Sequence, residues 1–368
     1  MVDIETYSGS GVTSAGFITA FFVVLLAIPS LIKVAKLKHL VDEPSEDRKL
    51  HSRSVPTIGG IVIFGAIIFS YSLWFPEHYD SLPHHMLANF KYLIAILILL
   101  FFVGVKDDII GTDPLKKLVA HVMVGFILVV MAEIRIESMH GLFGVHSLDE
   151  SISILLSLFV YIVIVNAVNL IDGLDGLAAG IGFIIAIAFG FLFYFNHNVP
   201  LSLLGFVLAG ALLGFLVFNF SPARIFMGDS GSLTIGAIIS VLALNAVNIN
   251  TGNNPDWLQG NMPILVMAIL VYPLVDTLRV FTIRALKGQS PFTADKNHIH
   301  HRFILLGYSH RQTVLRLYGL NVIVIVGAFL IERYIPVNVT IQFLLILAVA
   351  GMLTLIPFVM KPKSPVNA

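Results

Sequence analysis

Long apolar runs, separated by short polar segments, recur along the whole chain. A run of about 17–25 apolar residues is long enough to cross a bilayer as a helix. The pattern predicts eleven membrane-spanning helices, at residues 15–35, 59–75, 90–106, 117–133, 151–171, 177–196, 200–218, 230–248, 262–283, 313–332 and 340–360. We therefore expect an all-α integral membrane protein that forms one polytopic domain over residues 1–368.

The composition supports this expectation. The 368 residues are 57% hydrophobic and 12% charged, whereas a soluble domain carries about 25% charge. Mean hydropathy is +0.92. No cleavable signal peptide is expected, because no positively charged segment precedes the first apolar run near Ala15. The absence of cysteine excludes disulfides and thiolate metal sites.

The distribution of Lys and Arg predicts the orientation. All but three of the 22 basic residues lie on one side of the predicted spans, and the exceptions are Lys91, Arg135 and Arg333. Basic loops stay in the cytoplasm. The pattern predicts that the N-terminus lies outside and that the C-terminus lies in the cytoplasm. The conspicuous polar segments all fall on the cytoplasmic side.

The position of the polar segments favours an enzyme over a transporter. A transporter more often carries charge near mid-span, or inverted repeats with broken helices, and this sequence shows neither. Polar residues at span ends fit an enzyme that joins one water-soluble and one lipid substrate at the inner membrane surface. A transporter, or a binding protein that has lost catalysis, is the alternative.

Residues 166–180, NAVNLIDGLDGLAAG, place two carboxamides and two carboxylates at the foot of an apolar helix. Asp172 and Asp175 are three residues apart, so one helical turn would place them on one face. The glycines leave room for a ligand or a neighbouring backbone. The alternative is a solvated turn between helices, since Asp-Gly pairs are common turn signals.

Two further segments carry carboxylates. Asp107 and Asp108 end the third span, and adjacent carboxylates repel each other unless a cation or a basic partner such as Lys116 or Lys117 lies nearby. Asp229 lies in MGDSGSL, where helix N-terminal amides could attract phosphate while the carboxylate holds a metal. The alternatives are a solvated helix end for the pair and a plain N-cap for MGDSGSL.

A histidine-rich segment follows the ninth span. His298, His300, His301 and Arg302 cluster in HIHHR. Three histidines can indicate zinc, but the other candidate sites are oxygen donors. Imidazoles beside Arg suit phosphate oxygens better, and a structural role is the remaining alternative.

The loop at residues 41–60 is also basic, and Arg48, Lys49, His51 and Arg53 could contact phosphate or be ordinary cytoplasmic loop charge. Together, five segments on one side of the membrane offer carboxylates, carboxamides and a basic histidine cluster. That set fits Mg²⁺-dependent transfer chemistry on a diphosphate.

Four motifs, in order, carry a family resemblance. The pair Asp107-Asp108, NAVNLIDGLDGL, MGDSGSL and HIHHR, within a core of about 42–302, resemble the polyprenyl-phosphate N-acetylhexosamine-1-phosphate transferases. A sister branch, the phospho-MurNAc-pentapeptide transferases, has HHH followed by an acidic residue. HIHHR is instead similar to the branch that starts O-antigen, enterobacterial common antigen, teichoic acid or capsule glycans.

The resemblance implies that UDP-sugar and undecaprenyl phosphate give undecaprenyl-diphospho-sugar and UMP, with Mg²⁺ or Mn²⁺ as cofactor. GlcNAc is the expected sugar, with GalNAc or a diacetamido sugar open. A homodimer is left open, and no nucleic acid partner is expected. Asp276 also matches a family position. The implied site residues are Asn169 and Asp229 for the metal; Asp107, Asp108, Asp172 and His300 for catalysis; and Lys117, Asn166, Asp175, Asn219, Phe226, Arg284, His298, His301 and Arg302 for substrate.

Overall fold

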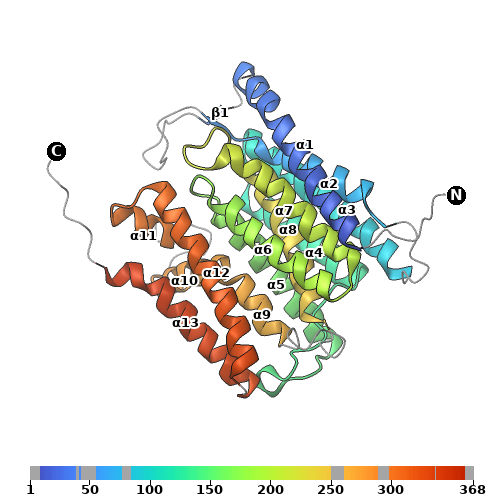
Figure 1. Ribbon diagram of the computed structural model, residues 1–368, viewed down its shortest axis with the longest axis vertical. Helices are drawn as coiled ribbons and strands as arrows, with labels where there is room; N and C mark the ends of the chain where they lie inside the picture. Colours follow the sequence, from blue (N-terminus) through green and yellow to red (C-terminus); the bar gives the residue numbers. More distant parts are fainter. Residues whose placement is uncertain are drawn as a thin grey trace.

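The computed structural model describes residues 9–38, 41–42, 55–76, 84–249, 261–288, 298–335 and 337–360. Helices form nearly all of it (Figure 1). Two short strands, β1 (Val41–Asp42) and β2 (Val55–Pro56), pair antiparallel. The helices are α1 (Gly9–Leu37), α2 (Gly59–Leu73), α3 (His84–Ile110), α4 (Pro114–Phe126), α5 (Glu150–Leu170), α6 (Leu177–Phe195), α7 (Val199–Asn219), α8 (Gly228–Val247), α9 (Met262–Ile269), α10 (Val271–Leu286), α11 (Ile299–Leu305), α12 (His310–Tyr334) and α13 (Val339–Val359).

The expected all-α membrane class is confirmed. Every one of the eleven apolar segments overlaps a helix or a pair of consecutive helical pieces. Within the described ranges, seven helices are long and apolar enough to cross a membrane, or eight if the bent pair α9–α10 counts as one span. The helix α2 has 15 residues, and α4 continues into a π-helix at Ile127–Met131. That eleven segments cross the bilayer, and in which direction, stays a prediction.

The helix α8 lies at the centre of the bundle and is buried along nearly its whole length (Figure 1). It packs against α2, α3, α5 and α6. Small residues allow the closest approaches: a Cβ at Gly60 of α2 would overlap the backbone nitrogen of Gly231. A Cβ at Gly104 of α3 would overlap the backbone of Ser230. Close packing of this kind joins helices in a bilayer, and here it places the end of α3 beside the start of α8.

The ninth apolar segment is not one straight span, contrary to the prediction for residues 262–283. It bends by 77° between α9 and α10. Pro273 explains the bend, because proline has no N–H to bond the carbonyl of Ile269 and its ring clashes with that carbonyl. The buried side chain of Asn321 on α12 satisfies the interrupted backbone. It accepts from Tyr272 N at 3.3 Å and donates to Ile269 O at 3.4 Å.

The two ends of the bundle are built from different helix ends and loops. At one end, the segment between α4 and α5 folds against the end of α8, where Glu137 N donates to Asn248 Oδ1 at 3.0 Å and Asn248 Nδ2 donates to Arg135 O at 2.5 Å. At the other end, the last turns of α3 and α5 meet the first turns of α4 and α8. The candidate site lies at this second end.

Candidate active site

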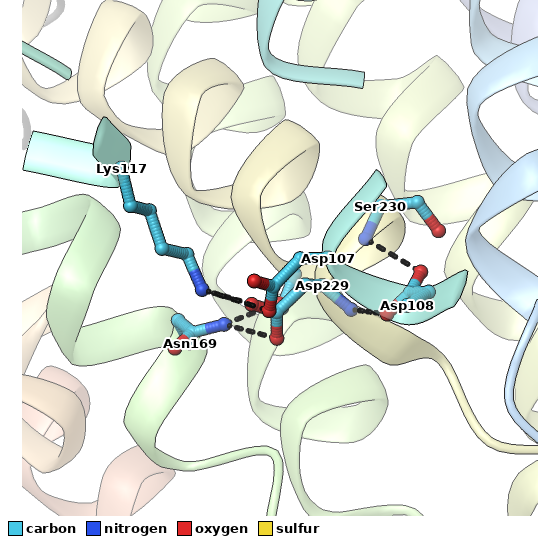
Figure 2. A network of polar contacts seen from close by, with 7 residues as sticks. Asp107, Asp108, Lys117, Asn169, Asp229 and Ser230 are labelled. Carbon is cyan, nitrogen blue, oxygen red and sulfur yellow. Dashed lines mark hydrogen bonds and ion pairs between the residues drawn. The ribbon is translucent and has the colours of Figure 1, made fainter. Parts of the chain in front are cut away.

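Asp229, in the first turn of α8, is the centre of a polar network drawn from four helices (Figure 2). Its carboxylate forms an ion pair with Lys117 Nζ, from α4, and accepts from Asn169 Nδ2, at the end of α5, at 3.0 Å. Lys117 Nζ also lies 3.3 Å from Asp107 Oδ2, at the end of α3. Asn169 Nδ2 lies 2.8 Å from Ser232 Oγ. The structure thus brings four predicted residues, more than 100 positions apart in sequence at the extremes, into direct contact.

Asp108 has a different set of partners from its neighbour Asp107. Its two carboxylate oxygens accept from the backbone amides of Asp229, at 2.6 Å, and Ser230, at 3.0 Å (Figure 2). These amides begin α8 and have no partner within that helix. Asp108 therefore caps α8 from another helix. The amides that the sequence offered for phosphate already bind this carboxylate.

Gly228 makes that cap sterically feasible. Its φ is +71°, a backbone conformation that glycine adopts readily. A Cβ there would lie 2.7 Å from both carboxylate oxygens of Asp108 and would overlap Thr57 O. Gly228, the first glycine of MGDSGSL, is therefore required by the close approach of α3 and of the segment before α2.

Residues 171–176 form a tight turn between α5 and α6, as the adjoining apolar runs predicted. Asp172 and Asp175 do not share a helical face, because neither lies in a helix. Asp175 Oδ2 accepts from Ala223 N at 3.0 Å. Burial, together with the nearby charges of Asp229 and Asp108, raises the pKa of Asp172 to about 7. Asp172 therefore belongs electrostatically to the carboxylate network.

Three predicted substrate-binding residues lie in or beside the carboxylate network and the α5–α6 turn. Asn219 connects the turn to the segment before α8: its Oδ1 accepts from Gly176 N at 3.0 Å and its Nδ2 donates to Ile225 O at 2.9 Å. The backbone N–H of Phe226 donates to Pro56 O at 2.7 Å. Asn166 bonds within α5, where its Nδ2 donates to Ile162 O at 2.8 Å.

The histidines of HIHHR form a cluster of rings at the start of α11. The His298 and His300 rings are nearly parallel with centroids 5.4 Å apart, and the His301 ring centroid lies 4.4 Å from that of His300. His300 Nε2 would lie 3.1 Å from a Cβ at Gly173, so the cluster contacts the Asp172–Asp175 turn. Burial lowers the pKa of His300 to about 3, which keeps its imidazole neutral at pH 7.

The two arginines of the prediction take other positions. Arg302 faces the end of α13, where its Nε donates to Pro357 O at 3.0 Å and its guanidinium donates to Met360 O at 2.9 Å. This side chain ties α11 to α13. Arg284 is buried on α10, with its guanidinium 6.0 Å from the Phe281 ring. Their contacts with substrate stay predictions.

The donor set of the network fits a hard divalent cation by its chemistry. Carboxylate oxygens of Asp107 and Asp229 and the amide of Asn169 lie together, and Mg²⁺ prefers oxygen ligands completed by water and substrate phosphates. Across the described ranges, no three His, Asp or Glu side chains converge as a complete protein site. Lys117 bridges the two carboxylates, so a bound cation would share or replace the ammonium contact.

The basic loop residues Arg48, Lys49, His51 and Arg53 lie outside the described residues. The first two residues of α2, which follow that loop, bind the segment before α8 through their backbone. Gly59 N donates to Phe226 O at 3.0 Å, and Gly60 N donates to Met227 O at 2.8 Å. These bonds hold the segment before α8 against α2.

Comparison with known proteins places this geometry in a family. Residues 90–247 match the glycosyl transferase family 4. A decaprenyl-phosphate N-acetylglucosaminephosphotransferase of Mycobacterium tuberculosis is 34% identical over 97% of this chain and 92% of its own length. The chain belongs to the polyprenyl-phosphate N-acetylhexosamine-1-phosphate transferase family.

Two other members of this transferase family also match most of the chain. An undecaprenyl-phosphate α-N-acetylglucosaminyl 1-phosphate transferase of Escherichia coli is 28% identical over 81% of this chain and 78% of its own length. A probable undecaprenyl-phosphate N-acetylglucosaminyl 1-phosphate transferase of Bacillus subtilis is 30% identical over 86% of this chain and 84% of its own length. The matches span the carboxylate network and most of the bundle.

The sequence did not indicate every residue that shapes this transferase site. Tyr318, on α12, donates its hydroxyl hydrogen to Gly176 O and packs where a Cβ at Gly180 would lie. Nothing around Tyr318 in the sequence marks it, since it lies inside an apolar run. The glycines of NAVNLIDGLDGLAAG were the available signal, because they predicted that another group approaches closely.

Proposed function

We propose that this protein transfers GlcNAc-1-phosphate from UDP-GlcNAc to undecaprenyl phosphate and releases UMP, at the cytoplasmic face of a bacterial inner membrane. The product would start a lipid-linked glycan of the cell envelope. The observation that carries the proposal is the joining of Asp107, Lys117, Asn169 and Asp229 at one end of the bundle. The substrate class follows the three relatives reported above, each of which is named for transfer of N-acetylglucosamine phosphate to a polyprenyl phosphate.

The chemistry that we propose needs little from a general base. A lipid phosphate is largely ionised at pH 7, since the second pKa of a phosphate monoester is about 6. Its oxygen can therefore attack the β-phosphorus of UDP-GlcNAc directly, and the bond to the UMP oxygen breaks. Lys117 is close enough to the carboxylates to contact phosphate oxygens beside them. We favour this direct route over an aspartyl-phosphate intermediate.

The proposed cofactor is Mg²⁺, with Mn²⁺ as a substitute. Asp229, Asn169 and Asp107 would hold it, and it would neutralise negative charge on the diphosphate during transfer. Asp172 would lie beside this charge. The histidine cluster contacts the turn that carries Asp172, so His300 would face the diphosphate or the sugar.

A direct assay tests the proposal. Purified protein in detergent is incubated with undecaprenyl phosphate, Mg²⁺ and one of several UDP-sugars, and UMP is measured. We expect UMP only when both substrates are present, and fastest with UDP-GlcNAc. Decaprenyl phosphate belongs in the panel, because one relative is named for that lipid. No UMP from any pair of substrates would reject the proposal.

The same assay separates the two alternatives. A transporter would release no UMP in detergent, where no transmembrane gradient exists. A phospho-MurNAc-pentapeptide transferase would respond to UDP-MurNAc-pentapeptide and not to UDP-GlcNAc. The motif HIHHR and the names of the relatives both favour the N-acetylglucosamine substrate.

A further inference from the structure

Asp276 is a fully buried carboxylate on α10, outside the network around Asp229. Its two oxygens have separate partners at the start of α11. Oδ2 lies 2.8 Å from His298 Nδ1, and Oδ1 accepts from Ile299 N at 2.8 Å. A carboxylate removed from water is costly unless it is hydrogen-bonded on its oxygens. Among the described residues, Asp276 meets that condition through the first two residues of the histidine motif.

The contact with Ile299 gives α11 a hydrogen-bond acceptor for its first backbone N–H. This helix has seven residues, and the side chain of its N-cap residue, His298, makes no capping hydrogen bond. A helix this short is not stable alone in water. Because the backbone N–H of Ile299 donates to Asp276, α10 fixes where α11 begins. The histidine cluster then takes its position from a residue 22 positions earlier than His298.

The contact with His298 selects one form of its ring. A carboxylate accepts hydrogen bonds, so the imidazole donates from Nδ1, and a neutral ring then has its lone pair on Nε2. Carboxylates orient metal-bound histidines in the same way. The His298 ring stacks on that of His300 with an interplanar angle of 12°, and His300 contacts Gly173. The orientation of the His298 ring therefore affects the position of His300, which contacts the turn that carries Asp172.

We propose that Asp276 is a positioning residue: it holds His298 in the Nδ1-protonated form and anchors the start of α11 so that the histidine cluster faces the Asp172–Asp175 turn. This inference rests on the proposed transferase function for its kinetic readout only. A purely structural cap would stabilise α11 without any dependence on the tautomer of His298. The two roles therefore predict different behaviour in variants.

The first variant is Asp276→Asn, which keeps the size of the side chain and an oxygen for Ile299 N. Its amide N–H faces His298 Nδ1, so the ring proton moves to Nε2. We expect kcat to fall about 10–100-fold, the range seen when carboxylates that orient metal-bound histidines are removed. The KM for UDP-sugar should change less than twofold, and the melting temperature should stay close to that of the wild type.

Thr277→Val is the matched control. Thr277 is the next residue on α10, it is buried, and its hydroxyl has no hydrogen-bond partner among the described residues. The substitution keeps the shape of the side chain at the same depth. Its kcat, KM and melting temperature should match the wild type.

The second variant separates an effect on the position of the histidine ring from an effect on protein stability. His298→Asn keeps an N–H that can donate to Asp276 but removes the Nε2 edge of the ring. We expect wild-type stability with a reduced kcat. If Asp276→Asn does not fold, this variant alone decides the inference. Full kcat in His298→Asn would overturn it.

The tautomer provides a readout independent of turnover. In protein labelled with ¹⁵N-histidine, the His298 signals are those missing from His298→Asn. We expect the Nδ1-protonated pattern in the wild type and the Nε2-protonated pattern in Asp276→Asn. An unchanged tautomer, or an unchanged kcat in Asp276→Asn, would overturn the inference. Absence of UMP release by the wild type would instead reject the proposed function and leave the tautomer result standing.

Discussion

At the scale of residues, two adjacent aspartates have different partners. Asp107 pairs with Lys117, while Asp108 binds the first amides of α8. Negative charge at the end of α3 is opposed by the dipole of that helix, and the positive end of α8 offsets this cost. These two sets of partners offset the repulsion between the adjacent carboxylates.

Asp108→Ala should destabilise the protein more than Asp107→Ala. The first removes a charged acceptor from two backbone amides, which costs about 1.5–3 kcal/mol. The second breaks a partly exposed ion pair, worth about 0–1 kcal/mol. Unfolding of both variants, measured side by side in detergent, checks the order. Equal losses would show that Asp108 is not a cap for α8.

Asp229→Asn should keep the fold and lose most activity. The change preserves the shape of the side chain but removes the charge at the centre of the network. Loss of one preorganised electrostatic contact costs about 10²–10³ in rate. UMP release, with a melting curve beside it, measures the effect. Full activity of this variant, or wild-type turnover in EDTA, would contradict the proposed metal site.

At the scale of elements, helix ends and helix breaks build the site. The starts of α2 and α8 approach each other so closely that a Cβ at Gly60 would overlap the backbone of Gly231. The bend between α9 and α10 leaves backbone groups that Asn321 satisfies from α12. Both contacts depend on a second element, so the sequence of one helix does not by itself decide how its end packs.

Gly60→Ala should destabilise the bundle by about 1–3 kcal/mol, the usual cost of overpacking. Gly65→Ala is the matched control on the same helix, because a Cβ there meets nothing within 4 Å. That variant should be neutral or slightly more stable, since alanine is the better helix former. Melting curves of the two proteins in one detergent decide it. Similar stabilities would argue against the close approach of α2 and α8.

Asn321→Leu should cost about 1–3 kcal/mol, because it leaves Tyr272 N and Ile269 O buried without partners. Asn245→Leu is the control. Among the described residues, the Asn245 amide donates to Val241 O within its own helix, so its loss leaves no backbone break there unsatisfied. Thermal unfolding compares the two substitutions. A harmless Asn321→Leu would mean that water or another group satisfies the bend.

At the scale of the whole molecule, the polar network and the histidine cluster share one end of the bundle. The last helices, α10 to α13, lie on the side of the bundle opposite α1 (Figure 1). They reach the network through α11 and through Tyr318 of α12, both of which contact the α5–α6 turn. The site therefore needs both sides of the bundle to be assembled.

Topology can be tested with single cysteines, because the chain has none of its own. Lys38→Cys, near the site end, and Asp149→Cys, at the other end, are both exposed. The distribution of Lys and Arg predicts that a membrane-impermeant thiol reagent labels only Asp149→Cys in intact spheroplasts. Lys38→Cys should react after permeabilisation. Labelling in the opposite order would place the site in the periplasm and reject the proposed use of a cytoplasmic UDP-sugar.

The sequence by itself determined where the helices form and which of their ends carry chemistry. Both follow from short-range properties: an apolar run must be helical in a bilayer, and polar residues collect where it ends. The motifs around Asp107, Asn169 and Asp229 could therefore be assigned to one end of a bundle before any fold was known.

Only the tertiary structure decided which partner each of these side chains takes. Asp108 and Asp107 are neighbours in sequence, yet one caps α8 and the other binds Lys117. Arg302 belongs to the histidine motif but binds α13, and Asp276 lies outside that motif but binds His298. A hydrogen bond forms only when its two heavy atoms lie within about 3.5 Å. Which donors come that close to a carboxylate depends on how distant helices pack, and no local pattern encodes that packing.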